Sequence, residues 1–271
     1  MTIRSGPALY SQIGANPRST KLGHDTVASQ VWCELRVRYH PLPMPELPPA
    51  SEHPIRVWDL PTRVFHWVLA LTIVGSVISA KVGGNAMTWH FRLGLLALAL
   101  VVFRMLWGFV GGRWSRFASF VYAPATLLRY LRGQAAPGEH LDVGHNPLGS
   151  LSVFALLAIV AVQITTGLLA DDEIANAGPL NRFVSSATGS SATGWHKEWG
   201  QWLLLALVVL HVAAIVFYRL RHRKDLVRPM VVGDKPLPPD TPASADGLPQ
   251  RLLAAALALA CVALAVWIGR L

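Results

Sequence analysis

Four histidines in this chain lie at the ends of long apolar runs or inside them: His66, His90, His196 and His211. Burying an imidazole in hydrocarbon is costly, so a histidine in such a run is a functional candidate. Imidazole nitrogen is also an axial ligand of haem iron, and two imidazoles fill both axial positions. The four residues are therefore candidate metal ligands, provided that the elements carrying them can bring them together in pairs.

These elements are expected to be membrane-spanning helices. Of the 271 residues, 52% are hydrophobic and only 14% are charged. The apolar residues gather in five runs of roughly 20 residues each, the length that crosses a hydrocarbon core of about 30 Å. We place the spans at 64–82, 89–110, 148–170, 199–218 and 252–268. The first run lies too deep in the chain, and is too long, to be a secretory signal.

Basic residues are distributed unevenly between the two ends of the spans. If the residues before the first span are cytoplasmic, 14 Lys and Arg residues fall on the inner side and five on the outer side. This bias predicts a membrane protein with its N-terminus in the cytoplasm and its C-terminus on the outer side. The net charge of +9 is thus a topology signal that also favours anionic lipid, and nucleic-acid binding is not expected.

Motifs typical of soluble enzymes are missing. The two cysteines, Cys33 and Cys261, are too few for a metal cage, and no C-x-x-C-H is present for covalent haem attachment. Phosphate-binding glycine loops, H-E-x-x-H and G-x-S-x-G are also absent. We expect no disulfide, and we interpret Cys261 as a small buried hydrophobe in a fifth span that serves as scaffold.

The sequence divides into four parts. Residues 1–54 are predicted to be a disordered, proline-rich tail in which Met44 is a candidate initiator. Residues 55–235 form the histidine-bearing membrane domain, residues 236–250 a cytoplasmic linker and residues 251–271 a C-terminal transmembrane helix. The fold class is therefore all-α integral membrane, a four-helix bundle with a fifth helix added.

Two loops are long enough to carry structure of their own. In the inner loop, a proline at 124 and a glycine at 133 frame a short helix whose leucines and arginines suit a membrane interface. The outer loop, 171–195, opens with three acidic residues. It is either a plain connection or a docking surface for an external partner.

The spacing of the histidines predicts two pairs at two depths. At about 1.5 Å and 100° per residue, the 15 residues from His196 to His211 correspond to roughly 22 Å along the helix and about 60° around it. The fourth span runs inward, so His196 is outer and His211 is inner. The first span runs outward from His66 and the second inward from His90. We therefore expect His66 to face His211, and His90 to face His196.

Small residues accompany three of the histidines. Ala70, Gly94 and Gly200 each follow a histidine by four residues and therefore share its helix face. A flat macrocycle lying against a helix needs such small side chains. Small residues are also common wherever transmembrane helices touch, so this explanation stays open.

Other interpretations of the histidines remain. Any one of them can sit among lipid headgroups, although His211 lies well inside an apolar run. His145, just before the third span, is an alternative ligand at the inner level. The histidines can also be proton relays in a transporter or a structural subunit, but no internal repeat or broken helix favours a transporter.

Five segments of the chain resemble prokaryotic cytochrome b561 proteins and the b-type cytochrome subunits of nickel–iron hydrogenases. They are VWDLPTRVFHW (57–67), WHFRLG (89–94), HKEW (196–199), LHVAA (210–214) and KDLVRPMVVG (224–233). The resemblance covers about 55–235, and neither the tail nor the fifth span has a counterpart in it. The interval from His196 to His211 is one residue longer than the resemblance implies, which a local bulge or the helix onset can absorb.

The resemblance implies a four-helix bundle with two non-covalent haem b groups, in which His66, His90, His196 and His211 are the iron ligands. It implies electron relay between the quinone pool and a redox partner, such as a c-type cytochrome, a hydrogenase-like enzyme or another periplasmic oxidoreductase. The alternative is a self-contained enzyme of the same fold that oxidises superoxide or another small reductant and reduces quinone.

Four basic residues lie at the depths of the histidines and can pair with haem propionates. Arg63 and Arg104 are at the inner level, and Arg92 and Lys197 at the outer level. For Arg104 and Arg92, snorkelling to lipid phosphate is the preferred interpretation. Arg63 is therefore the arginine that we assign to cofactor binding.

Overall fold

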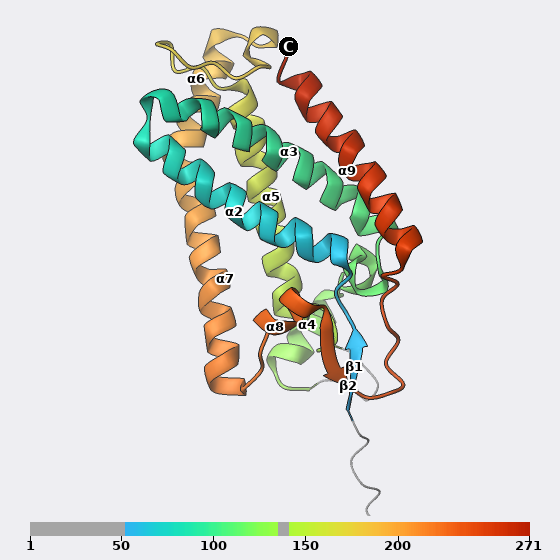
Figure 1. The fold of residues 1–271 in the computed structure, drawn as a ribbon. Helices are drawn as coiled ribbons and strands as arrows, with labels where there is room; N and C mark the ends of the chain where they lie inside the picture. The colour runs from blue at the N-terminus through green and yellow to red at the C-terminus, as the bar shows by residue number, and fades with distance from the viewer. Residues whose placement is uncertain (1–51, 135–140) are drawn as a thin grey trace, which may run out of the picture. The chain divides into compact units, whose positions relative to one another are not determined.

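A computed structural model describes residues 52–134 and 141–271, all within one compact unit, Ala50–Leu271. Helices α2 and α3 run side by side, α5 and α7 lie behind them, and α9 packs against α3 (Figure 1). The main elements are β1 (His53–Arg56), α2 (Leu60–Val82), α3 (Met87–Val110), α4 (Pro124–Leu131), α5 (Pro147–Leu169), α6 (Ser186–Gly194), a π-helical segment (Trp195–Gly200), α7 (Gln201–His222), α8 (Val227–Val232), β2 (Asp234–Leu237) and α9 (Leu248–Ile268).

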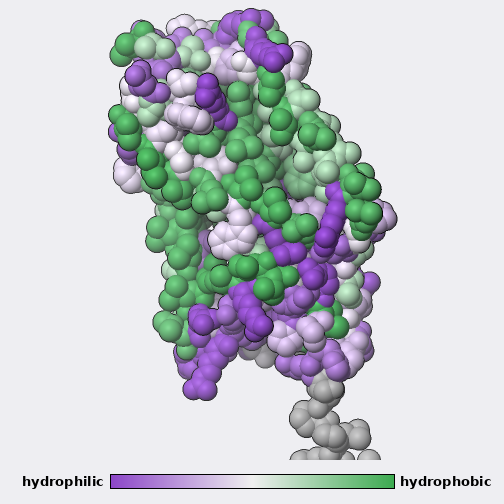
Figure 2. Space-filling view, viewed as in Figure 1, coloured by the Kyte–Doolittle hydropathy of each residue, from purple (hydrophilic) through white to green (hydrophobic). Residues whose placement is uncertain are grey.

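Five of the helical stretches are long and apolar enough to cross a membrane, which confirms the predicted fold class. They are Leu60–Val82, Gly84–Val110, Pro147–Leu169, Ser186–His222 and Leu248–Ile268. Figure 2 shows hydrophobic side chains over the middle of one face and hydrophilic ones gathered towards the end where α8 and the strands lie. We call this end of the unit the α8 end, and the opposite end, where α6 lies, the α6 end.

Capping residues explain why two spans begin earlier than their apolar runs. The Asp59 carboxylate accepts a hydrogen bond from the Thr62 amide at 2.8 Å, and Pro61 lies in the first turn of α2. In α5, the Asn146 side chain accepts from the Gly149 amide at 2.7 Å, and the helix starts at Pro147. A side-chain acceptor satisfies a free amide of the first turn, and proline there loses no hydrogen bond.

The fourth span differs from the expectation at its outer end. Residues 186–194, predicted as loop, form helix α6, which the Ser185 hydroxyl caps by accepting from the Thr188 amide at 3.2 Å. The helix then continues through the π-helical segment into α7. The low hydropathy of 186–194 hid this extension, because serine and glycine are weak helix formers that capping and packing must hold.

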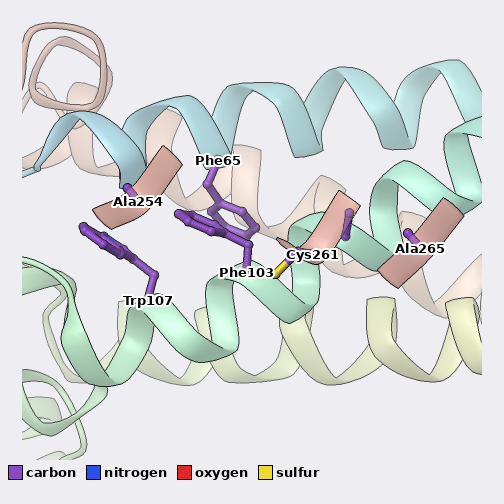
Figure 3. Packing of buried hydrophobic residues seen from close by; sticks show 7 residues of the cluster. Phe65, Phe103, Trp107, Ala254, Cys261 and Ala265 are labelled. Atoms are coloured by element: carbon purple, nitrogen blue, oxygen red, sulfur yellow. The ribbon is translucent and has the colours of Figure 1, made fainter. Parts of the chain in front are cut away.

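Helix α9 packs mainly on α3 and to a lesser extent on α2. Small residues of α9 lie against large aromatic rings of the other two helices (Figure 3). Cys261 is 4% exposed within this cluster, as expected for a buried hydrophobe, and it is a free thiol. In lipid, such close packing is the main source of helix association. The cluster consists of Phe65, Phe103, Trp107, Ala99, Ala254, Cys261 and Ala265.

A two-stranded ribbon at the α8 end was not expected from the sequence. Strand β1 pairs antiparallel with β2, with His53 opposite Leu237 and Arg56 opposite Asp234. Residues 53 and 54, assigned to the tail, thus belong to a strand, and part of the predicted linker 236–250 is bound to the domain. The Ser244 hydroxyl, for example, donates to the Val57 carbonyl at 2.7 Å. Prolines in both segments masked this non-local pairing.

The short helix predicted in the inner loop is present as α4, and Gly133 just beyond it has φ +70°, where glycine is favoured. The remainder of the predicted tail, with Met44 and Cys33, lies outside the described residues.

Candidate functional site

The first histidine pair lies near the α8 end. His66 projects from α2 and His211 from α7, and their ring centroids are 6.4 Å apart with planes inclined at 50°. Helices α2 and α7 are not among the closely packed helix pairs of the described chain. The two rings therefore face each other across a separation between helices.

The second pair lies near the α6 end. His90 projects from α3 and His196 from the π-helical segment, with ring centroids 5.9 Å apart and planes inclined at 85°. The structure thus brings together both pairs that the spacing predicts, with His196 and His211 on one continuous helical stretch, Ser186–His222.

Both separations suit a single metal atom held between two imidazoles. At about 2 Å per metal–nitrogen bond, two imidazoles on opposite sides of one metal have ring centres roughly 6 Å apart. In the described residues, no group of three or more His, Cys, Asp or Glu side chains is placed to hold a metal ion. The arrangement therefore offers two-ligand sites, which suit iron whose other four ligands come from a porphyrin.

Hydrogen bonds at Nδ1 orient the rings of the second pair. His90 Nδ1 lies 2.9 Å from the Ser76 carbonyl oxygen, and His196 Nδ1 lies 2.9 Å from the Gln163 carbonyl oxygen. A carbonyl can only accept, so each Nδ1 must carry the proton and donate it. The lone pair is then left on Nε2, as a metal ligand requires, with the ring direction fixed.

The first pair has weaker support of this kind. His211 Nδ1 lies 3.4 Å from the Ser152 hydroxyl, a long contact. His66 Nδ1 is buried with no hydrogen-bond partner among the described residues. The main chain therefore fixes the second pair more firmly than the first.

The π-helical segment accommodates the extra residue between the fourth-span histidines. A π turn inserts one residue into an α-helix and leaves a main-chain group free to pair elsewhere. Here the Gln163 side-chain amide of α5 donates to the His196 carbonyl at 2.8 Å. Of the two ways to absorb the extra residue, a local bulge or the helix onset, the structure has the bulge, and it carries His196 itself.

Gln163 and Gly167 were missed by the sequence reasoning. A Cβ at Gly167 would lie 2.9 Å from His196 Cε1, so only glycine lets α5 approach this ring. The sequence does contain a sign of this contact. Gln163 is a polar residue inside an apolar span, and Gly167 follows it by one helical turn.

The three predicted small residues have different surroundings. A Cβ at Gly94 would meet no atom within 4 Å, whereas a Cβ at Gly200 would lie 2.1 Å from the Gln163 side-chain oxygen. Gly200 therefore makes room for α5 rather than for the space between the histidines. Ala70 is half-buried on α2.

The four basic residues have different surroundings. Arg63 donates to the Val231 carbonyl at 2.6 Å and thereby ties α8 to α2. Arg104 does not snorkel: it is 2% exposed and donates to the Ser115 carbonyl at 3.0 Å. The prediction that Arg104 snorkels to lipid phosphate was wrong, because the segment after α3 folds over its side chain.

At the α6 end, Arg92 is exposed and lies 5.1 Å from the Trp89 ring centre, and Lys197 is exposed. Both positions are compatible with a membrane interface.

His145, the alternative ligand, lies beside the first pair rather than in it. Its ring packs between Trp58 and Phe120, at centroid distances of 4.6 and 4.7 Å. Burial, followed by the charge of Arg104, lowers the pKa of His145 to about 3. It is therefore a neutral, aromatic-lined neighbour of the first pair at physiological pH.

Comparison with known proteins identifies the family to which the chain is similar. The family model described as "Prokaryotic cytochrome b561" matches residues 57–233. Proteins named "Probable Ni/Fe-hydrogenase B-type cytochrome subunit" are 29% identical in Azotobacter vinelandii, over 69% of this chain and 91% of the relative, and 24% identical in Bradyrhizobium diazoefficiens, over 67% and 85%. A "Probable Ni/Fe-hydrogenase 1 B-type cytochrome subunit" of Escherichia coli is 25% identical over 58% and 80%. No solved structure matches the chain significantly.

The matched region includes all four paired histidines and ends before α9. With five membrane-spanning helices and a family match over most of its length, the chain belongs to the prokaryotic cytochrome b561 family, whose members are b-type cytochromes of electron transport.

Proposed function

We propose that this chain is a diheme b-type cytochrome that relays electrons between the quinone pool and a partner oxidoreductase. The supporting observation is the pair of facing imidazoles at each end of one helical bundle, with ring centroids 6.4 and 5.9 Å apart. His66 and His211 would hold one haem, and His90 and His196 the other.

Bound haem supplies one-electron chemistry, and filling both axial positions favours electron transfer over substrate binding at iron. The protein's own groups set the geometry. His90 and His196 are oriented by main-chain carbonyls, and α7 with the π-helical segment carries one ligand of each pair. The ligand positions on this stretch lie roughly 22 Å apart at an α-helical rise. Two haems at this spacing would connect the two sides of a bilayer.

The orientation follows from the charges. The α8 end carries the basic cluster at the end of α7 (Arg219, Arg221, Arg223 and Lys224), so we place it in the cytoplasm of a bacterial cell and the α6 end outside the inner membrane. The relatives are named as subunits of nickel–iron hydrogenases, so we propose a hydrogenase-like partner at the α6 end.

The haem content of the purified full-length chain tests the proposal. We expect a reduced-minus-oxidised α-band of haem b and two haems per chain. One haem per chain would contradict the double pairing, and none would overturn the function. Quinone reduction by a small reductant without any partner protein would favour the self-contained enzyme instead.

A further inference from the structure

Arg104 is a buried cation whose hydrogen bonds are incompletely used. Its side chain is 2% exposed and lies within a membrane-spanning helix. One terminal nitrogen, Nη2, donates to the Ser115 carbonyl at 3.0 Å, and the guanidinium carbon lies 4.7 Å from the Phe117 ring centre. The other terminal nitrogen, Nη1, is buried and has no partner among the described residues.

A buried guanidinium needs a counter-charge, because removing an ion from water costs several kcal/mol. No described carboxylate forms an ion pair with Arg104. The charge of Asp59 acts on Arg104 without an ion pair between them. The Asp59 oxygens accept hydrogen bonds from Thr62, Gly112 and Trp107 instead. Arg104 is therefore positioned for an anion that the described residues do not supply.

Contacts through Ser115 connect Arg104 to the part of α2 that carries His66. The Ser115 residue that binds Arg104 also contacts Thr62, with the two hydroxyl oxygens 2.8 Å apart. Thr62 precedes His66 by four residues, one helical turn on the same face of α2. Arg104 is thus linked, through Ser115 and Thr62, to the turn of α2 that precedes His66.

A second polar group beside the pair is also without a partner. His145 Nδ1 is buried and unpaired within the described ranges. Its ring packs against Trp58 and Phe120, and it lies within electrostatic range of Arg104, His66 and His211. Two unsatisfied buried groups next to the same pair are unusual, since nearly all buried polar atoms in proteins are hydrogen-bonded.

We propose that Arg104, assisted by His145, binds a propionate carboxylate of the haem held by His66 and His211. This proposal rests on the diheme function proposed above. A guanidinium binds carboxylate through strong, charge-assisted hydrogen bonds, and Nη1 is free to make one. Arg63, the arginine assigned to this role from the sequence, donates to the Val231 carbonyl and lies 4.0 Å from the Asp246 carboxylate, so its charge already has a partner. Arg104 then raises the potential of that haem, because positive charge near iron disfavours its oxidised form.

Redox titration of the full-length chain tests this role. In Arg104→Gln we expect the midpoint potential of the first-pair haem to fall and to become dependent on pH, since an unpaired buried carboxylate takes up a proton. Arg104→Lys retains the charge and should shift the potential less. His145→Phe keeps the aromatic packing and should produce a small shift in the same direction.

Two internal controls accompany these variants. The second-pair haem reports on folding and should keep its potential throughout, and it is identified as the haem that remains in His211→Ala. Arg92→Gln removes an exposed arginine at the α6 end and should leave the first-pair haem unchanged.

The outcomes separate a propionate anchor from a purely structural residue. Loss of the first-pair haem in Arg104→Gln, with recovery in Arg104→Lys, also supports the anchor. Unchanged potentials in Arg104→Gln at every pH, or equal loss of that haem in both variants, would overturn it. A wild-type protein without haem would instead overturn the diheme function.

Discussion

The two histidine pairs are built from the same residue type but are held in different ways. In the second pair, both Nδ1 atoms lie 2.9 Å from main-chain carbonyls, and Gln163 fixes the π-helical segment from α5. In the first pair, His211 has only a long contact to a hydroxyl and His66 has no partner at Nδ1. Main-chain carbonyls therefore orient the rings of the second pair, whereas the rings of the first pair lack such main-chain hydrogen bonds.

This difference indicates where each site is vulnerable. A ring held by main-chain carbonyls is insensitive to most substitutions but sensitive to helix packing, because packing sets the position of those carbonyls. The first pair lacks such main-chain bonds and lies within electrostatic range of His145, so it is sensitive to charge at the α8 end. The first pair should therefore respond to charge changes, and the second to steric ones.

The largest expected effect is complete loss of one haem from each single histidine variant. His66→Ala and His211→Ala should remove the same spectral component, and His90→Ala and His196→Ala the other, because each iron needs both of its axial ligands. Haem-to-protein ratio and low-temperature spectra measure this. His222→Ala, at the exposed end of α7, is the control. If His66→Ala and His90→Ala removed the same component, the pairing would be wrong.

A steric change at Gly167 should affect the second pair alone. In Gly167→Val the new Cβ would lie 2.9 Å from His196 Cε1 and 3.2 Å from its Nδ1, and the ring cannot retreat without breaking its bond to Gln163. Overpacking costs about 1–3 kcal/mol, so we expect roughly tenfold weaker haem binding there.

Haem retention during dilution or competition with an apo-haemoprotein measures the effect of Gly167→Val. Gly194→Ala is a matched control, because its added Cβ meets no atom within 4 Å. Equally weakened haem binding at both pairs would contradict the proposed difference between them.

The smallest effect concerns Asp246, which binds the start of α2 to α9. Burial raises the pKa of its carboxyl, but hydrogen bonds from Arg251 and the Leu60 amide, with the charge of Arg56, outweigh this and lower it. A lowered folded-state pKa stabilises the fold above the unfolded pKa of about 3.9, and this contribution disappears as the pH falls through the folded value. Asp246→Asn should remove it at neutral pH, at a cost of about 1 kcal/mol.

Unfolding curves between neutral and acidic pH, followed at both haems, test the Asp246 prediction. The wild type should lose stability at the α8 end on acidification, and Asp246→Asn should lack that part of the pH dependence. Identical pH profiles for the two proteins would show that the carboxylate makes no net contribution.

The sequence alone was sufficient to predict the membrane-spanning helices and the depths of the histidines in them. Long apolar runs fix the number of crossings, and alternating crossings fix which histidine reaches which side. The ring separations between His66 and His211, and between His90 and His196, agree with that reasoning.

The sequence was not sufficient where the outcome depends on contacts between distant segments. The burial of Arg104 depends on Ser115 and Phe117 folding back over α3, which no helical periodicity encodes. The π turn at His196 depends on Gln163 from another helix. The β1–β2 ribbon joins segments about 180 residues apart that contain proline, so neither resembles a strand by itself.

That ribbon has a consequence for how the fifth helix is retained. Lipid tails are as apolar as the surface of α9, so the hydrophobic effect does not drive this helix onto α3. Helix α9 therefore relies on van der Waals contact with α3. Strand β2 and the Ser244 hydroxyl anchor the chain shortly before α9 begins at Leu248. The anchored residues act as a short tether that gives α9 a high effective concentration at its docking face. The tether therefore adds to the packing on α3 in keeping α9 docked.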